Sequence, residues 1–362
     1  MRTDTHDGAF NRYPDQRDVI ALAPEFGVRF TLFIDTEEEF DWGKPFSRTD
    51  HTVNSLRGLA EGQSYLTRSG VRPVHMVDYP ILESPAAVEL LRAWLAAGEC
   101  DVGAQLHPWV NPPHEEQVTA ANSYVGSLPE ELERAKICAL RDRITAELSK
   151  PPVSFRAGRY GVGPNSARLL EEEGFLLDSS VRALFDYRDQ LGPNFYHLPL
   201  VPYWAGPERR LVELPLSTTF TGYLRGLGRP LYSFARKFGP LPGGLSKLGM
   251  LTRVALTPEG IPVGNALEAI DKMLDDGVRV LNLSFHSPSL EPGHTPYVRD
   301  AADLRAFYGW WDAVLNRMTL RGVQAASLDE FLAAVPPPEF RIKACKDKQR
   351  SAIGRPSTGG GL

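Results

Sequence analysis

A run of acidic residues follows directly on an apolar stretch near the start of the chain. Residues 28–35 read VRFTLFID, and the sequence continues with Thr-Glu-Glu-Glu. β-branched and aromatic residues favour a strand, and in α/β barrels the catalytic groups lie at the carboxyl ends of the strands. Because side chains alternate along a strand, Asp35 and Glu37 are expected to point inward together. We interpret Asp35 as a functional carboxylate, and Glu38 and Glu39 as solvated loop residues.

A second polar cluster lies in the stretch GAQLHPW, residues 103–109. Alternation places Gln105 and His107 on one face at the end of a strand. A neutral imidazole is a good ligand for zinc-like cations, whereas an amide supplies only a weaker oxygen. A single histidine before proline fits a capping or core role equally well, so both interpretations stay open. Asp78, in HMVDYP, ends another expected strand and is positioned to line the same mouth.

Two further strand ends carry groups suited to acid–base and oxyanion chemistry. The stretch RAGRYG, residues 156–161, contains two glycines, which let the backbone approach a ligand and donate its N–H groups. The apolar run LNLSFH ends in His286, a residue type that acts as a general acid or base near neutral pH. Glu213, in LVELPLS, is interpreted as a structural residue at a strand end.

Strand and helix patterns alternate along the chain and would position these residues. Strands are predicted over residues 28–35, 71–77, 101–106, 154–157, 175–179, 212–216, 278–285 and 323–325. Helices are predicted over residues 53–68, 86–97, 130–148, 164–173, 264–275, 301–318 and 328–334. Seven or eight β/α repeats with near-continuous apolar strands predict a buried parallel sheet in a closed or nearly closed α/β barrel.

Three segments fall outside this repeat. Residues 1–24 form an N-terminal extension to a barrel over residues 25–335. Residues 218–262 are longer than a usual connection and hold many glycines and prolines, so we expect a lid or side wall rather than a separate domain. Residues 336–362 are basic and nearly free of apolar side chains, which predicts a disordered tail.

Composition excludes several classes of function. Of 362 residues, 42% are apolar and 23% are charged, as in soluble globular proteins. The net charge of -5 gives no general attraction to nucleic acid or to anionic lipid. The 3 cysteines lie far apart, the N-terminus lacks a signal pattern, and no apolar run is long enough to span a membrane. We therefore expect a cytoplasmic protein without membrane insertion; its oligomeric state stays open.

The order of these motifs resembles the polysaccharide deacetylase superfamily, also called the NodB-homology or carbohydrate esterase 4 family. The matching stretches are FIDTE, QLHPW, RAGRY and LSFH, in the family's order within residues 28–335. The resemblance implies a distorted (β/α)7-8 barrel of the polysaccharide deacetylase (glycoside hydrolase/deacetylase) type. The combination of LHPW with FHSPSLEPGHTPYV is similar to a divergent, WalW-like branch found with bacterial surface-polysaccharide genes.

The sequence departs from the family at the metal ligands. The first motif of the family usually has two adjacent aspartates, whereas Thr36 follows Asp35 here and Glu37 comes one residue later. The second motif usually supplies two histidines, and Gln105 stands at the first of these positions. Three states stay open: a divalent cation, zinc or similar, held by Glu37, His107 and a third group; a metal-free hydrolase; or a protein that has lost its activity.

The resemblance also implies roles and a substrate class. Asp35 would be the general base, His286 the general acid, and Arg156 the residue that orients Asp35. Substrate contacts are expected from Gln105, Trp109, Tyr160 and Asp78. The implied activity is hydrolysis of a non-peptide carbon–nitrogen bond, as N-deacetylation of an N-acetylated sugar or of a surface-polysaccharide precursor. The alternatives are a hydrolase of a non-sugar amide such as a cyclic ureide, and a non-catalytic carbohydrate-binding relative.

Overall fold

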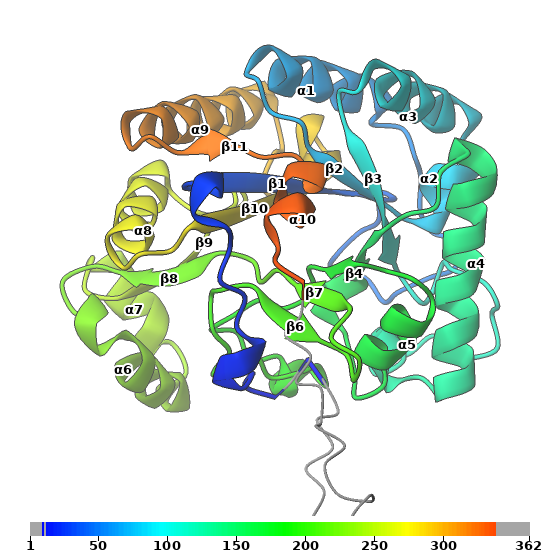
Figure 1. Cartoon of the computed structure of the whole chain (residues 1–362). Coiled ribbons are helices and arrows are strands. Elements are labelled where there is room, and N and C mark those ends of the chain that lie inside the picture. The colour runs from blue at the N-terminus through cyan, green and yellow to red at the C-terminus, as the bar shows by residue number, and fades with distance from the viewer. Residues whose placement is uncertain (1–8, 11, 338–362) are drawn as a thin grey trace, which may run out of the picture.

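Parallel strands form the centre of the protein and curve around it, with helices outside (Figure 1). The computed structural model describes residues 9–10 and 12–337. Neighbouring strands follow the order β10 (Val280–His286), β1 (Arg29–Thr36), β2 (Val74–Val77), β3 (Asp101–Leu106), β4 (Ser154–Ala157), β5 (Leu177–Asp178), β7 (Leu211–Glu213) and β6 (Tyr203–Ala205). Pairing is parallel up to β7, and β11 (Gln324–Ala325) also pairs in parallel with β1. The edge strand β6 runs antiparallel to β7 and is not predicted by the sequence pattern.

The sheet is closed by backbone hydrogen bonds between its two ends. The N–H of Ser217, just after β7, donates to the carbonyl of Asn282 in β10 at 3.0 Å. The N–H of Leu256 donates to the carbonyl of Ser217 at 3.0 Å, and that of Ser284 donates to the carbonyl of Leu256 at 3.3 Å. The predicted α/β barrel is therefore confirmed, as a distorted barrel with several short strands.

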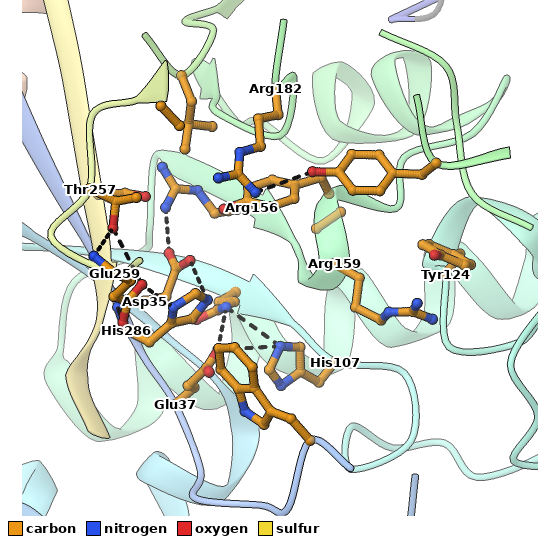
Figure 2. A pocket seen from close by; sticks show the side chains of 18 of the residues that line it. Asp35, Glu37, His107, Tyr124, Arg156, Arg159, Arg182, Thr257, Glu259 and His286 are labelled. Atoms are coloured by element: carbon orange, nitrogen blue, oxygen red, sulfur yellow. Dashed lines mark hydrogen bonds and ion pairs between the residues drawn. The ribbon is translucent and has the colours of Figure 1, made fainter. Parts of the chain in front are cut away.

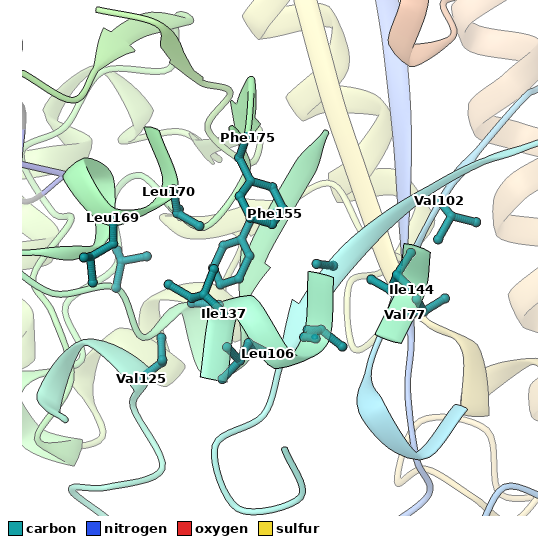
Figure 3. Packing of buried hydrophobic residues seen from close by; sticks show 14 of the residues in the cluster. Val77, Val102, Leu106, Val125, Ile137, Ile144, Phe155, Leu169, Leu170 and Phe175 are labelled. Carbon is teal, nitrogen blue, oxygen red and sulfur yellow. The ribbon is translucent and has the colours of Figure 1, made fainter. Parts of the chain in front are cut away.

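Helices cover the outside of the sheet. They are α1 (Leu56–Arg68), α2 (Tyr79–Glu83), α3 (Pro85–Ala97), α4 (Glu130–Leu148), α5 (Ser166–Glu172), α8 (Val263–Asp275) and α9 (Ala301–Leu320). In contrast, α10 (Leu328–Ala334) lies over the middle of the barrel in Figure 1. Figure 3 shows Ile137 of α4 near Leu106 and Phe155, and Ile144 of the same helix near Val77 and Val102, all in one buried cluster. Apolar burial of this kind supplies most of the stability of a helix in a protein.

Local sequence sets the ends of these helices. The Ser84 hydroxyl accepts a hydrogen bond from the N–H of Ala87 and caps α3, and Pro85 occupies its first turn. The same helix ends at Gly98, whose φ of 70° lies in the left-handed region that glycine adopts without steric cost. These boundaries are within two residues of those predicted from the periodicity.

The register of the strands brings distant motifs to the same level. In the β1–β10 pair, Asp35 lies beside His286, and in the β3–β4 pair, Gln105 lies beside Arg156. Because parallel strands share their carboxyl ends, these four residues meet at one end of the barrel. Motifs separated by up to 251 positions in the sequence thus form one site.

The long segment 218–262 has its own secondary structure. It forms an antiparallel pair of strands, β8 (Thr218–Thr221) and β9 (Thr252–Ala255), with helices α6 (Gly228–Ala235) and α7 (Leu241–Lys247) between them. Phe220 and Leu251 of this segment pack in a small cluster with Leu184 and Tyr196 of the barrel. The segment therefore packs against the rest of the protein; that it is a lid or side wall rather than a separate domain stays a prediction.

The two ends of the chain differ in how much of them is described. The guanidinium group of Arg279, next to β10, donates to the carbonyls of Leu22, Ala23 and Gly27, so the extension before β1 is attached to the barrel. The predicted tail lies outside the described residues from residue 338 onward. Within the described part of the chain, no helix combines the length and the apolarity needed to span a membrane.

Candidate active site

A cavity of about 360 Å³ opens at the carboxyl ends of the strands. Its lining includes six of the predicted catalytic, metal-binding and substrate-binding residues: Asp35, Glu37, Gln105, His107, Arg156 and His286. Trp109 and Tyr160 also line it. Figure 2 shows several of these side chains converging from β1, β3, β4 and β10. The volume lies in the usual range for small-molecule sites.

Asp35 is held by a buried arginine. Only 2% of Asp35 and 1% of Arg156 are exposed, and the Nη1 of Arg156 donates to the Oδ1 of Asp35. The other donors of Arg156 bind Ser179, its carbonyl at 2.9 Å and its hydroxyl at 3.1 Å. This contact leaves the Oδ2 of Asp35 facing His286, whose Nε2 lies 3.7 Å away. Asp35 is therefore fixed in one orientation, with one oxygen directed into the cavity.

His286 is oriented by a carboxylate that the sequence did not identify. Its Nδ1 lies 2.7 Å from the Oε2 of Glu259, and its backbone N–H donates to the Oε1 of Glu259 at 3.1 Å. Burial opposes the charged imidazole, but the carboxylates of Glu259, Glu37 and Asp35 prevail and raise the pKa of His286 to about 10. The ring is thus an imidazolium near neutral pH, with Nε2 directed toward Asp35.

Glu37, Gln105 and His107 form a third group at the cavity wall. The Nε2 of Gln105 donates to the Oε2 of Glu37 at 2.8 Å. The Nε2 of His107 lies 3.5 Å from both partners, so it has no close contact on this side. Burial raises the pKa of Glu37 to about 7. Thr36, between the two cavity carboxylates, instead places its hydroxyl 2.8 Å from the Nδ1 of His75, away from the cavity.

The other face of His107 contacts two acids behind the cavity. Its Nδ1 lies 2.9 Å from the Oε2 of Glu38 and 3.7 Å from the Oδ2 of Asp78. Ligand atoms of Glu38, Asp78 and His107 lie within 4.8 Å of one another, so this buried group could bind a metal ion. Burial raises the pKa of Glu38 to about 8 and that of Asp78 well above its usual range, so a cation here would have to displace protons.

The donor atoms also fit a cation on the cavity side of His107. The Oε1 of Gln105 is buried and accepts no hydrogen bond from any described residue. Turning this amide over would direct Oε1 toward the Glu37 carboxylate, an arrangement that a cation between the two oxygens would stabilise. Glu38 would then accept from the Nδ1–H of His107, as carboxylates commonly do for metal-binding histidines. Carboxylate, imidazole and amide oxygen together form a mixed N/O set suited to a divalent ion.

Two of the predicted substrate-binding residues need comment. Asp78 does not line the cavity: it is fully buried, accepts from the N–H groups of Glu38 and Ile81, and caps α2. Trp109 lines the cavity but is only 2% exposed. Its ring stacks on His107 at 4.4 Å between centroids, and its Nε1–H donates to Glu38 at 3.1 Å. Both residues thus support His107 from behind.

Sequence reasoning misplaced or missed several residues in and behind the cavity. Glu38 was interpreted as solvated but is 1% exposed, because the chain turns back into the barrel after β1. Glu39 is also buried and binds the start of α1 through the N–H groups of Asn54 and Ser55. Glu259 and Arg182 lie in irregular segments without a local pattern, so no sequence signal identified them.

The chain is similar in fold to several solved structures of known proteins. The sequence matches no protein-family model and no curated protein. A probable polysaccharide deacetylase from Pseudomonas aeruginosa PAO1 is 15% identical with a TM-score of 0.49, over 86% of this chain and 92% of that chain. An allantoinase is 13% identical with a TM-score of 0.48, over 92% and 97%. A 4-alpha-glucanotransferase from Thermococcus litoralis is 13% identical with a TM-score of 0.49, over 86% and 41%.

Other similar structures are also deacetylases, among them a polysaccharide deacetylase from Bacillus cereus that is 12% identical, with a TM-score of 0.36 over 83% of this chain and 93% of that chain. None of the three similar proteins above shares more than 15% of its residues with this chain. Solved structures to which the chain is similar thus include polysaccharide deacetylases, the family that its four sequence motifs resemble.

Proposed function

We propose that the protein hydrolyses the amide bond of an N-acetylated sugar, releasing acetate and a free amine. The observation that carries this proposal is the pairing of Asp35 with Arg156 and of His286 with Glu259 in one cavity. A carboxylate and an imidazolium whose reactive atoms lie 3.7 Å apart are suited to act as base and acid on one substrate. The four motifs support membership of the polysaccharide deacetylase superfamily, and LHPW with FHSPSLEPGHTPYV supports the WalW-like branch.

In this mechanism Asp35 accepts a proton from a water molecule as the water oxygen attacks the amide carbonyl carbon. Arg156 keeps Asp35 in place. The carbonyl oxygen becomes an oxyanion, which we assign to the backbone N–H near Tyr160. His286 then donates its Nε2 proton to the nitrogen as the carbon–nitrogen bond breaks, and Glu259 stabilises the imidazolium before this transfer.

We further propose that Glu37 and His107, with the amide oxygen of Gln105, hold a divalent cation at the cavity wall. When bound, such an ion polarises a carbonyl and makes a water more acidic. Glu38 orients His107 through Nδ1, and Trp109 fixes the plane of the ring. The Glu38–Asp78–His107 group is the competing position for the ion, and it lies behind the cavity.

Aromatic side chains at the mouth support a carbohydrate substrate. Trp42 is 38% exposed and its ring centroid lies 5.0 Å from that of His286. Tyr297 is 39% exposed and lies 5.7 Å from Trp42. Exposed aromatic faces next to the general acid provide an apolar platform for the C–H face of a sugar ring.

The experiment that tests this proposal measures acetate release from N-acetylated sugars together with the metal content of the purified protein. Acetate release with bound metal supports both parts of the proposal. Acetate release from metal-free protein removes the cation and leaves the acid–base pair in place. No acetate release from any N-acetylated sugar, with or without added zinc, contradicts deacetylation.

A second candidate function has one observation in its favour. The Nε2 of Gln105 donates to Glu37 at 2.8 Å, so these two residues are already hydrogen-bonded to each other without any ion. That arrangement favours a metal-free hydrolase of a non-sugar amide, such as a cyclic ureide. Turnover of a cyclic ureide by metal-free protein, with no acetate release from sugars, would support this alternative.

A further inference from the structure

Some of the positively charged side chains that line the cavity have no acidic partner among the described residues. Asp35 is paired with Arg156 and Glu259 with His286, while Glu37 accepts from Gln105. Two further arginines, Arg159 and Arg182, line the same cavity. Neither forms an ion pair with any acid in the described part of the chain. Arg159 donates instead to the hydroxyl of Ser123, and Arg182 to the hydroxyl of Tyr187. The cavity therefore holds two guanidinium groups without a counter-ion.

Arg182 is held in place mainly by aromatic rings and has a single side-chain hydrogen bond among the described residues, to Tyr187. Its guanidinium carbon lies 4.0 Å from the ring centroid of Phe185 and 5.3 Å from that of Tyr160. One Nη donates to the hydroxyl of Tyr187 at 3.4 Å, and its buried Nε has no hydrogen-bond partner among the described residues. Stacking fixes the plane of the group while leaving N–H donors at its edge free. In Figure 2, Arg182 lies across the cavity from Glu37 and His107.

A second arginine, Arg253, lies close to Arg182, so two positive charges repel each other unless an anion binds nearby. The guanidinium carbon of Arg253 lies 3.5 Å from the centroid of the same Phe185 ring. Burial lowers the pKa of Arg253, and the nearby charge of Arg182 acts in the same direction. Arg253 donates to the carbonyl of Leu184 at 3.0 Å and does not line the cavity. A purely structural cation–π contact would need only one of these arginines.

Arg159 is directed into the cavity by an unusual backbone. Arg159 and Tyr160 are consecutive non-glycine residues with φ of 56° and 60°, in the left-handed region. The guanidinium group stacks 4.1 Å from the centroid of Tyr124, and one Nη donates to the Oε1 of Gln190 at 3.2 Å. Strained backbone of this kind persists where the surroundings require a side chain in one position.

We propose that the cavity selects substrates carrying an anionic group, which binds Arg182 and Arg159 while the amide lies between Asp35 and His286. The inference deepens the proposed function, because it adds a carboxylate or a phosphate to the N-acetylated sugar. Both groups accept paired N–H donors from a guanidinium group, so the structure assigns an oxyanion and the experiment separates the two.

The test is direct binding, which does not depend on turnover. Inorganic phosphate probes a phosphate group, and glucuronate compared with neutral glucose probes a carboxylate. We expect the native protein to bind phosphate, or to bind glucuronate about tenfold or more tightly than glucose, and to lose this on raising the salt concentration. Phosphate binding alone identifies a phosphorylated substrate, and the glucuronate preference alone identifies an acidic sugar.

Variants identify the residue responsible. Arg182→Gln should weaken binding of the anionic probe about tenfold or more, and Arg182→Lys should retain part of it, because the charge remains without the paired donors. The matched control is Arg253→Gln, which removes the same charge from an arginine that contacts the same Phe185 ring but does not line the cavity, and it should change binding less than about threefold. Circular dichroism checks that each variant is folded.

Two results would overturn the inference. One is that folded native protein binds neither phosphate nor glucuronate better than glucose. The other is that Arg253→Gln weakens binding as much as Arg182→Gln, since the effect would then be a general field rather than a site. Either result leaves acetate release from neutral sugars untouched, so it can be told apart from failure of the proposed function.

Discussion

At the scale of single residues, each reactive group of the site has a partner that restricts what it can do. Arg156 makes Asp35 an acceptor with one free oxygen, and Glu259 makes His286 a donor. Arg156 fixes the orientation of Asp35, whereas Glu259 acts on both the orientation and the charge state of His286. The acid–base assignment therefore depends on four residues rather than two.

Asp35→Asn is expected to lower kcat by about 10²-fold or more, since it keeps the shape of the side chain but removes the proton acceptor. His286→Ala should have an effect of similar size. Rates of acetate release, together with thermal unfolding to check the fold, measure this. Full activity in Asp35→Asn would exclude Asp35 as the base.

Glu259→Gln tests the charge of the general acid. A raised pKa means that His286 stays protonated, and active as an acid, through neutral pH and loses its proton only near pH 10. Its contribution to stability is likewise complete below the ordinary histidine pKa, about 6.5, and is lost as the pH rises toward 10. Removing Glu259 should move the alkaline limb of the kcat/KM profile to lower pH. An unchanged limb would show that His286 does not control it.

Gln105→His tests whether the cavity wall is a weakened metal site. Imidazole binds zinc-like cations better than an amide oxygen, so we expect tighter divalent-cation binding with equal or higher activity. Calorimetric titration with zinc and acetate release measure the two effects. A variant that binds no more zinc and loses activity would favour the metal-free alternative, in which Gln105 is needed as a donor to Glu37.

At the scale of elements, the site depends on the close approach of neighbouring strand ends. Gly158 follows β4, and a Cβ atom there would overlap the imidazole ring of His107, which follows β3. A residue with a side chain at position 158 would therefore move either His107 or the turn that carries Arg159. The motif glycine is needed for packing around the site.

Gly158→Ala is expected to destabilise the protein by about 1–3 kcal/mol and to reduce activity and cation binding together. The control is Gly264→Ala in α8, where a Cβ would meet no atom within 4 Å and alanine favours the helix. Denaturant unfolding of both variants measures the difference. Equal stability of the two variants would mean that the loop after β4 adjusts freely.

At the scale of the whole molecule, binding at the site is linked to global stability. A ligand that binds only the folded protein stabilises it by about 2.7 kcal/mol at a hundred times its Kd. If the cation proposal holds, zinc should raise the unfolding midpoint and a chelator should lower it again. His107→Ala, which removes a ligand from both candidate positions, should abolish the shift. No shift in the native protein would contradict a resident cation.

The barrel and the positions of Asp35 and His286 at its strand ends followed from the sequence alone. Alternation of apolar strands with helical repeats predicted the barrel, because burial on both faces gives these strands a local pattern. Asp35 and His286 were found because each ends such a strand, and the register of β1 and β10 then places them side by side. The sequence also predicted Gln105 and His107 on one face, by the same alternation.

Tertiary structure alone decided the partners of these residues. Glu259 and Arg182 lie in irregular segments, where no periodicity indicates which way a side chain faces. Glu38 and Asp78 resemble solvated or cavity residues in the sequence, yet both are buried behind His107. The arginines and acids of the cavity come from segments across the barrel, and only folding decides that Arg159 and Arg182 lie there without an acidic partner among the described residues. Local patterns determine the strands and the residues at their ends, whereas long-range packing determines the charge and the partners that each residue has there.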